Sequence, residues 1–212
     1  MLIQQVLENP LYGLILLVAL AFAIGFHEAA HAYTAHWLGD DTPKTQGRLT
    51  LNPLNHLDPI GSLFILFAGI GWGRPVFFNP YNLKNPHRDA AIIAFAGPLA
   101  NIILASLAVL ILYVITATQL VDLRAAYAVG FTFIAINIAL AIFNLLPIDP
   151  LDGFKVVGGL LPPGLARQWY DLQPYGMYIL LFLLLTGGIG RIVGPINSFV
   201  FSYLYMLIAS MA

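Results

Sequence analysis

Residues Gly25–Leu38 read GFHEAAHAYTAHWL and contain the pattern His-Glu-x-x-His at positions 27 to 31. On an α-helix, residues four apart lie on one face about one turn from each other. The two imidazoles of His27 and His31 therefore point the same way, close enough to bind one metal ion. Glu28 lies beside them, where a carboxylate can act on a water molecule at that ion. We expect a metal site on the helix that carries these residues.

The segment before this motif is apolar. Leu11–Phe26 carries no charge and leads directly into His27. A carboxylate at membrane depth costs about 2.5–3.5 kcal/mol on insertion scales, and ionisable residues placed there are functional by default. The setting therefore favours a working site over the alternative, a buried polar cluster that only stabilises helix packing.

The composition indicates an integral membrane protein. Of the 212 residues, 59% are hydrophobic and 9% are charged, whereas a soluble domain carries about 25% charged residues. The net charge is −1, with no basic tail, which argues against nucleic acid as a partner. The chain has no cysteine, so any metal ligands must be histidine, carboxylate or water. We expect a single membrane-embedded domain over residues 1–212.

The apolar segments predict an all-α polytopic membrane protein with about five to six membrane helices. A membrane-spanning helix needs about 20 apolar residues, so one of these segments is short or re-entrant. Gly47–Leu51 and Pro75–Phe78 are predicted as short strands of a small membrane-associated β-hairpin or sheet. The expected helical segments are Leu11–Leu38, the short Ile60–Gly71, Ala90–Ala117, Ala125–Ile148, Pro174–Gly190 and Ile192–Ala212.

The basic residues predict the orientation in the membrane. Seven of the nine lysines and arginines lie in the two loops 38–90 and 149–174. Because cytoplasmic loops are enriched in lysine and arginine, both loops are expected in the cytoplasm. The histidine motif lies in the later half of its segment, so we expect a multi-pass protein of the cell membrane with its site towards the cytoplasmic side.

A catalytic zinc site usually has three protein ligands and leaves one position open for water. Asp152 follows the segment Ala125–Ile148, at the end that faces the same side as His31, and is our preferred third ligand. Gly153 permits a tight backbone next to it. Asp149 lies only three residues away, and spacing alone leaves both aspartates open.

Several motifs together carry a resemblance to a known family. The His-Glu-x-x-His inside an apolar segment, combined with NLLPIDPLDG at 144–153, resembles the site-2 protease family of intramembrane zinc metalloproteases. The stretches GRLTLNPLNHLDPIG at 47–61, PVFFNP at 75–80 and AGPLAN at 96–101 resemble its short-form members, which lack the PDZ and CBS domains of others.

This resemblance implies a zinc endopeptidase with one Zn2+ per chain, bound by His27, His31 and Asp152. It implies that Glu28 is the general base in the hydrolysis of peptide bonds near the cytoplasmic face. The expected substrates are transmembrane or membrane-anchored proteins in the lipid bilayer. Asn144, near the end of its helix, is expected to donate a hydrogen bond to the oxyanion or the substrate backbone.

Two further elements are expected to bind substrate. A transmembrane helix must unwind before cleavage, and its freed backbone then needs new hydrogen-bond partners. The strand formed by Arg48, Leu49, Thr50 and Leu51 is expected to pair with it. Asn101, which follows a Gly-Pro pair in its helix, is expected to face the same groove.

Two rival functions use similar residues. A metal or proton transporter also buries His, Glu and Asp, but it is expected to carry ionisable residues on several spans along a path. Here Ala90–Ala117 carries none. A catalytically silent relative that binds membrane proteins has no need of Glu28. The sequence does not determine the substrate or the oligomeric state.

Overall fold

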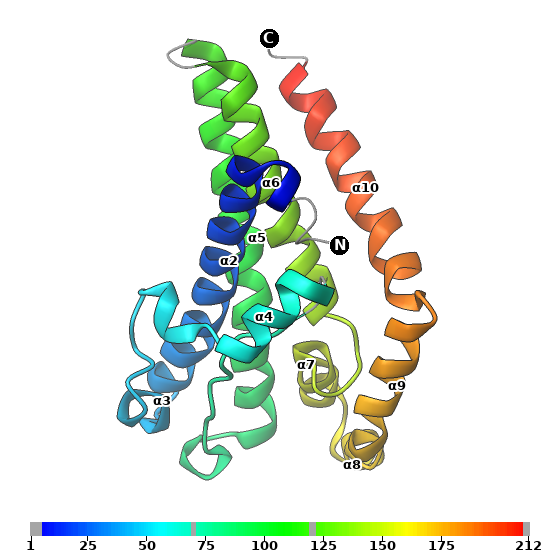
Figure 1. The fold of residues 1–212 in the computed structure, drawn as a ribbon. Helices are drawn as coiled ribbons and strands as arrows, with labels where there is room; N and C mark the ends of the chain where they lie inside the picture. The colour runs from blue at the N-terminus through cyan, green and yellow to red at the C-terminus, as the bar shows by residue number, and fades with distance from the viewer. Residues whose placement is uncertain (1–5, 69–70, 119–121, 210–212) are drawn as a thin grey trace.

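The computed structural model describes residues 6–68, 71–118 and 122–209 of the chain, and this part is helical (Figure 1). Three helices are long and apolar enough to cross a membrane: α2 (Pro10–Trp37), α5 (Pro86–Thr118) and α6 (Leu123–Asn144). A membrane span needs about 20 residues, and each of the three exceeds that length. The chain is therefore a membrane protein built of α-helices.

Shorter elements connect and follow the long helices. Helices α9 (Gln173–Leu185) and α10 (Gly188–Ala209) form a pair bent by 73°, the geometry of a broken span or a re-entrant loop. Gly187, with a φ of +71°, lies at the break. The remaining elements are α3 (Thr42–Thr45), η1 (Pro53–His56), α4 (Pro59–Ala68), η2 (Pro80–Asn82), α7 (Asp152–Leu160) and α8 (Pro163–Tyr170).

The core is formed where α2, α5, α6 and α7 meet. Helices α5 and α6 run side by side as an antiparallel hairpin, and α2 crosses both of them (Figure 1). The face that α2 turns inward carries small side chains, including the fully buried Ala23, Ala32 and Ala35. Small residues let helix backbones approach closely, as in other membrane helix bundles. This close approach brings residues of α5 within reach of the histidines on α2.

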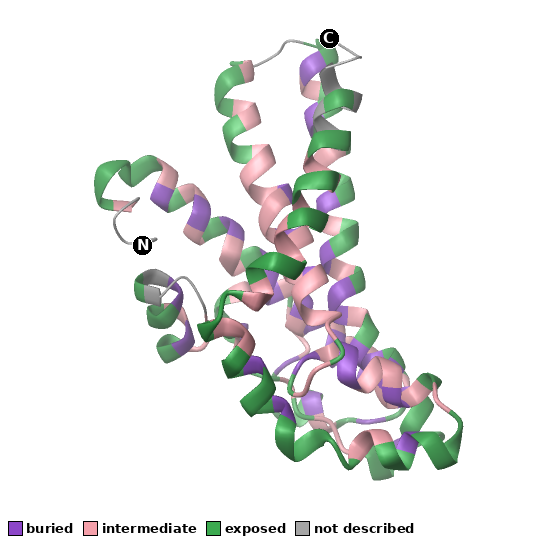
Figure 2. Cartoon of the chain, turned by 90° about the vertical axis from the view of Figure 1, so that its right-hand side faces the viewer, coloured by how far each residue is buried: buried purple, intermediate pink, exposed green. Residues whose placement is uncertain are grey.

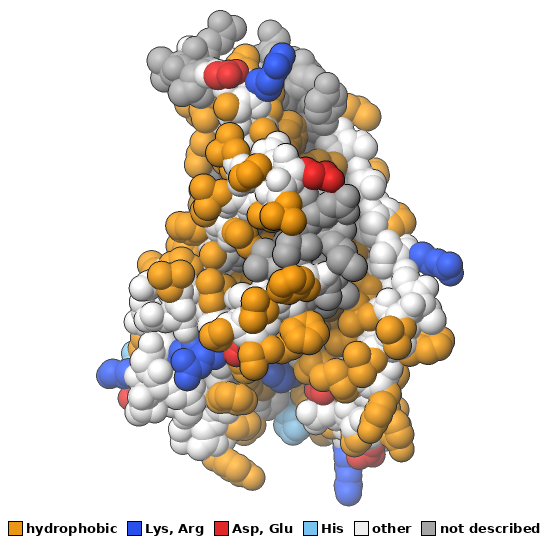
Figure 3. All heavy atoms as spheres, viewed as in Figure 1, with side chains coloured by type: hydrophobic (Ala, Val, Ile, Leu, Met, Phe, Trp, Pro, Cys, Tyr) orange, Lys and Arg blue, Asp and Glu red, His pale blue; other side chains and the backbone are white. Residues whose placement is uncertain are grey.

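The outer faces of the long helices are apolar. Leu14, Val18 and Phe22 on α2 are each more than two-fifths exposed, and exposed positions follow the outer side of the helices along their length (Figure 2). In the space-filling view, hydrophobic side chains cover the middle of the molecule and most visible Lys and Arg side chains lie near its lower end (Figure 3). This distribution fits a bilayer around the long helices.

The expected count of about five to six membrane helices is not confirmed by the described residues. The described residues contain three candidate spans, or four if the bent pair is counted as one. Helix α4 has ten residues, too few to cross a bilayer, as predicted for that segment. Helix α9 has thirteen residues and is also too short by itself, so the last two apolar segments do not form two separate spans.

The expected β-hairpin is absent from the part of the chain that the structure describes. An isolated bridge joins Leu57 to Gly73, and both residues lie outside the two expected strands. Residues 48–51 form a loop in which the Thr50 amide bonds the Arg48 carbonyl locally. Residues 75–78 have no regular secondary structure, and Pro75 has no N–H to donate to a ladder.

Candidate active site

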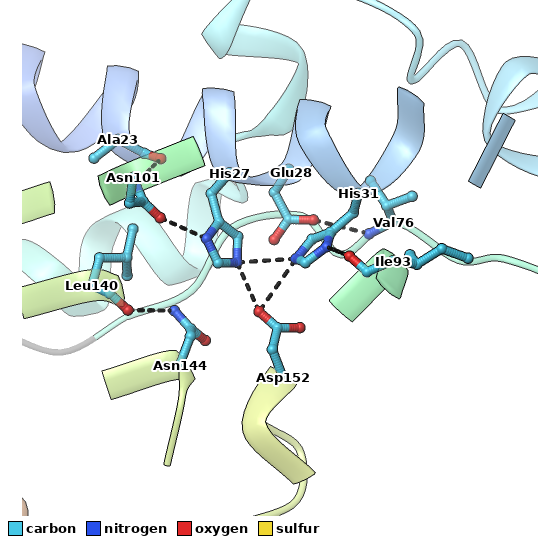
Figure 4. Close-up of polar contacts among 10 residues, drawn as sticks. All are labelled: Ala23, His27, Glu28, His31, Val76, Ile93, Asn101, Leu140, Asn144 and Asp152. Carbon is cyan, nitrogen blue, oxygen red and sulfur yellow. Dashed lines mark hydrogen bonds and ion pairs between the residues drawn. The ribbon is translucent and has the colours of Figure 1, made fainter. Parts of the chain in front are cut away.

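Helix α2 presents His27, Glu28 and His31 together near its C-terminal end (Figure 4). His27 and His31 are both buried, and their rings meet edge to face with centroids 4.6 Å apart. Their Nε2 atoms lie 3.1 Å from each other. The spacing of four residues therefore does bring both imidazoles to one point.

Asp152 completes this cluster from α7. It is the first residue of that helix, and its Oδ2 lies 3.1 Å from Nε2 of His27 and 3.3 Å from Nε2 of His31. The close approach of α7 to the end of α6 depends on Gly153, because a Cβ there would lie 2.2 Å from the Leu145 carbonyl oxygen. The three potential ligand atoms all lie within 4.8 Å of one another.

Asp149, the rival third ligand, lies elsewhere. Its backbone and Cβ pack against Gly176 of α9, and its side chain is hydrogen-bonded to Gln173. Burial raises the pKa of Asp149, against the opposing effects of Lys155 and Gln173. The metal-competent cluster among the described residues includes Asp152 and not Asp149.

The opposite ring nitrogens of both histidines face acceptors. Nδ1 of His27 lies 2.7 Å from Oδ1 of Asn101, and Nδ1 of His31 lies 2.7 Å from the carbonyl oxygen of Ile93. Each Nδ1 therefore carries the proton and donates it, which leaves a lone pair on each Nε2. Two lone pairs and a carboxylate then converge, and Oδ2 of Asp152 is buried without a hydrogen-bond donor. A cation satisfies all three groups, and two histidines with one carboxylate suit zinc.

Gly97 on α5 forms the wall behind the two imidazoles. A Cβ at this position would lie 2.5 Å from both Cε1 and Nε2 of His31 and 2.7 Å from Cε1 of His27. Any side chain here would therefore push both rings out of place. The close contact of Gly97 with the histidines was not predicted from the sequence.

Asn101, which was expected to contact substrate, lies inside the helix bundle and is hydrogen-bonded on all sides. It is completely buried, and its Nδ2 donates to the Ala23 carbonyl oxygen at 3.0 Å and to Oδ1 of Asn137 at 2.9 Å. With both donors used and Oδ1 facing His27, the side chain links α2, α5 and α6 beneath the histidines. Its bond to Asn137 is a hydrogen bond between two helices, a contact common in membrane bundles.

Glu28 lies beside the histidines but outside the ligand cluster (Figure 4). Its Oε2 accepts a hydrogen bond of 3.1 Å from the backbone N–H of Val76, which belongs to the segment between α4 and η2. Nothing in the sequence indicates this partner, because the donor is a backbone N–H 48 residues away from Glu28.

The other predicted site residues are spread around this cluster. Asn144 is half-buried near the cluster, and its Nδ2 donates to the Leu140 carbonyl oxygen at 3.0 Å (Figure 4). Arg48 is buried, and its Nη1 donates to the Asn55 carbonyl oxygen. Its role is therefore to hold its own loop. The Thr50 carbonyl accepts from Nε2 of His56 at 2.9 Å, while the neighbouring Leu51 is 57% exposed.

A membrane-embedded helical bundle with a His-His-Asp cluster and an adjacent glutamate defines a membrane metalloenzyme. Comparison with known proteins narrows this class. A Bacillus subtilis protein named "Putative zinc metalloprotease YwhC" is 40% identical over 176 residues, which cover 81% of this chain and 80% of that protein. "Putative zinc metalloprotease Rip2" of Mycobacterium tuberculosis (strain H37Rv) is 31% identical over 85% of this chain and 68% of its own length.

A more distant relative is "Zinc metalloprotease MJ0392" of Methanocaldococcus jannaschii, 23% identical over 86% of this chain and 45% of its own length. No family model and no solved structure matches the chain. The chain belongs to the site-2 protease family of zinc metalloproteases, and it is a zinc-dependent protease.

Proposed function

We propose that the protein is an intramembrane zinc endopeptidase that cleaves transmembrane or membrane-anchored proteins near the cytoplasmic face. One observation carries this proposal. Two imidazoles and the carboxylate of Asp152 converge between apolar helices, with Glu28 directly beside them. A site at this depth suits a substrate that is itself embedded in the bilayer.

Each site residue has a role in this proposal. His27, His31 and Asp152 would hold the zinc ion, which would supply Lewis-acid activation of a water molecule and of the scissile carbonyl. Glu28 takes the proton from the attacking water and passes it to the leaving amine. Asn144 uses its amide to donate a hydrogen bond to the oxyanion or the substrate backbone.

Substrate contact is assigned to the exposed part of the 49–51 loop. Leu51 is 57% exposed and lines an apolar groove of about 540 Å³ together with residues of α2 and α5, among them Tyr33 and Leu99. This groove lies on the α2 face next to the histidine motif. The buried Arg48 supports the loop from behind and takes no part in the contact.

The test is metal content and cleavage measured on the same purified detergent preparation. The substrates are a panel of single-span model proteins, and the variant is Glu28→Gln. Wild type is expected to contain about one zinc per chain and to cleave, while Glu28→Gln keeps its zinc and is inactive. Cleavage by Glu28→Gln would refute the role of the glutamate, and a wild type without zinc would refute the metal site.

The proposed orientation, in a multi-pass protein of the cell membrane, is tested separately. Because the chain contains no cysteine, single cysteines can be introduced at the exposed positions Lys84 and Asp122. A membrane-impermeant maleimide applied to intact cells is expected to label the Asp122→Cys protein and not the Lys84→Cys protein. The reverse labelling would place the site at the outer face.

A further inference from the structure

The segment Gly73–Asn79, called the strap here, runs along α2 beside the active site. Gly73 packs so closely that a Cβ would lie 2.5 Å from Cγ2 of Ile24 and 3.5 Å from Cγ of Glu28. Three residues further on, the Val76 N–H donates to Oε2 of Glu28 at 3.1 Å. The strap therefore packs against the stem of this side chain and bonds one of its two carboxylate oxygens.

The strap has no regular secondary structure of its own and is held at its two ends. At the start, the Arg74 N–H donates to the His56 carbonyl oxygen at 2.7 Å, next to the bridge between Leu57 and Gly73. At the end, the Asn79 N–H donates to Oδ2 of Asp40 at 2.7 Å. Val76 lies between these anchors, so its position depends on both.

Asp40 is fully buried and ties the end of the strap to the end of α2. Its own N–H bonds the Ala35 carbonyl oxygen in the last turn of that helix. Its Oδ1 accepts from the Thr42 hydroxyl at 2.6 Å and from Nδ2 of Asn82 at 2.7 Å, while Oδ2 accepts from Asn79. One carboxylate thus joins the helix that carries Glu28 to the segment that bonds Glu28.

We propose that Asp40 is a positioning residue for Glu28, acting through the strap and the Val76 N–H. This inference rests on the proposed function, in which Glu28 is the general base. A carboxylate on a flexible stem samples several rotamers, and a fixed donor on one oxygen selects a single orientation. The second oxygen of Glu28 is then directed to the side of His27 and His31 (Figure 4).

The experiment uses the purified full-length chain in detergent and four variants. Asp40→Asn replaces one acceptor oxygen with an amide that opposes the donors of its neighbours, and Val76→Pro removes the N–H that bonds Glu28. The matched controls are Asp41→Asn, an exposed neighbour whose carboxylate pairs with His36, and Val76→Ala, which keeps the N–H. Zinc per chain, thermal unfolding, kcat and KM are measured for each on a single-span substrate.

Asp40→Asn and Val76→Pro are expected to retain zinc and a KM within about twofold of wild type, with kcat lowered at least tenfold, since only the orientation of the base changes. Both controls are expected to match wild type. If Asp40 has only a structural role, kcat falls in proportion to the loss of zinc or of folded protein. A fall in kcat that is fully explained by either loss overturns the inference. If Asp40→Asn does not fold, unchanged kcat in zinc-loaded Val76→Pro overturns it.

The result with Glu28→Gln separates this inference from the proposed function. If Glu28→Gln is inactive while Asp40→Asn and Val76→Pro keep full kcat, the inference alone is wrong. If Glu28→Gln still cleaves, the proposed function is wrong and Asp40 has no base to position.

Discussion

Gly97→Ala is expected to damage the metal site while leaving the helix intact. The added Cβ would lie 2.5 Å from Nε2 of His31 and 2.7 Å from Cε1 of His27, whereas ordinary contacts begin at 3.4 Å. The rings must therefore retreat by about 0.9 and 0.7 Å. Zinc–ligand distances tolerate only about ±0.2 Å. Both histidines would then leave the range in which they bind zinc together with Asp152.

The expected loss of zinc affinity is at least 100-fold, the upper end of the 10–100-fold range seen when a ligand loses its supporting partner. This corresponds to about 2.8 kcal/mol of binding free energy. Helix propensity acts in the opposite direction, because alanine is favoured over glycine by about 1 kcal/mol inside a helix. Loss of α5 itself is therefore not the expected cause.

The assay is competition for zinc with a chelator of known affinity, on the purified protein in detergent. Gly164→Ala on α8 is the matched control, because a Cβ there meets no atom within 4 Å. It is expected to bind zinc and cleave like wild type. A zinc Kd for Gly97→Ala within about twofold of wild type would show that the contact between α5 and the imidazoles does not determine the metal site.

Three further predictions concern the same site and its surroundings. Asp152→Asn is expected to lose most bound zinc, while Asp149→Asn keeps about one zinc per chain, as measured by elemental analysis. The opposite pattern would make Asp149 the third ligand. Asn101→Ala removes the acceptor for Nδ1 of His27 and is expected to weaken zinc binding about 10–100-fold, which chelator competition measures. Burial alone would raise the pKa of Asp40, but hydrogen bonds from its neighbours hold it below its ordinary value of 3.8. Its stabilising effect is therefore complete above that pH and is lost as the pH falls below it. The difference in Tm between wild type and Asp40→Asn is expected to narrow below about pH 4, and a difference that is constant with pH would contradict this.

The catalytic motif was readable from the sequence because its spacing is local. The helix period alone places His27 and His31 on one face, and the apolar composition alone indicates a membrane protein. The number of membrane spans depends on how the helices bend and pack, which local spacing does not specify. The last two apolar segments meet near Gly187 at an angle of 73°, and hydropathy does not set the angle between two helices.

The sequence by itself predicted the pairing of His27 with His31, the neighbouring Glu28 and the membrane setting, since each depends on residue type and short-range spacing. Only the tertiary structure brings Asp152, and not Asp149, next to the two histidines, because that depends on how α7 packs against the end of α6. It also assigned Asn101 to His27 and the Val76 N–H to Glu28. Those partners lie 74 and 48 residues apart and meet through helix packing and a backbone group, neither of which has a local signature in the chain.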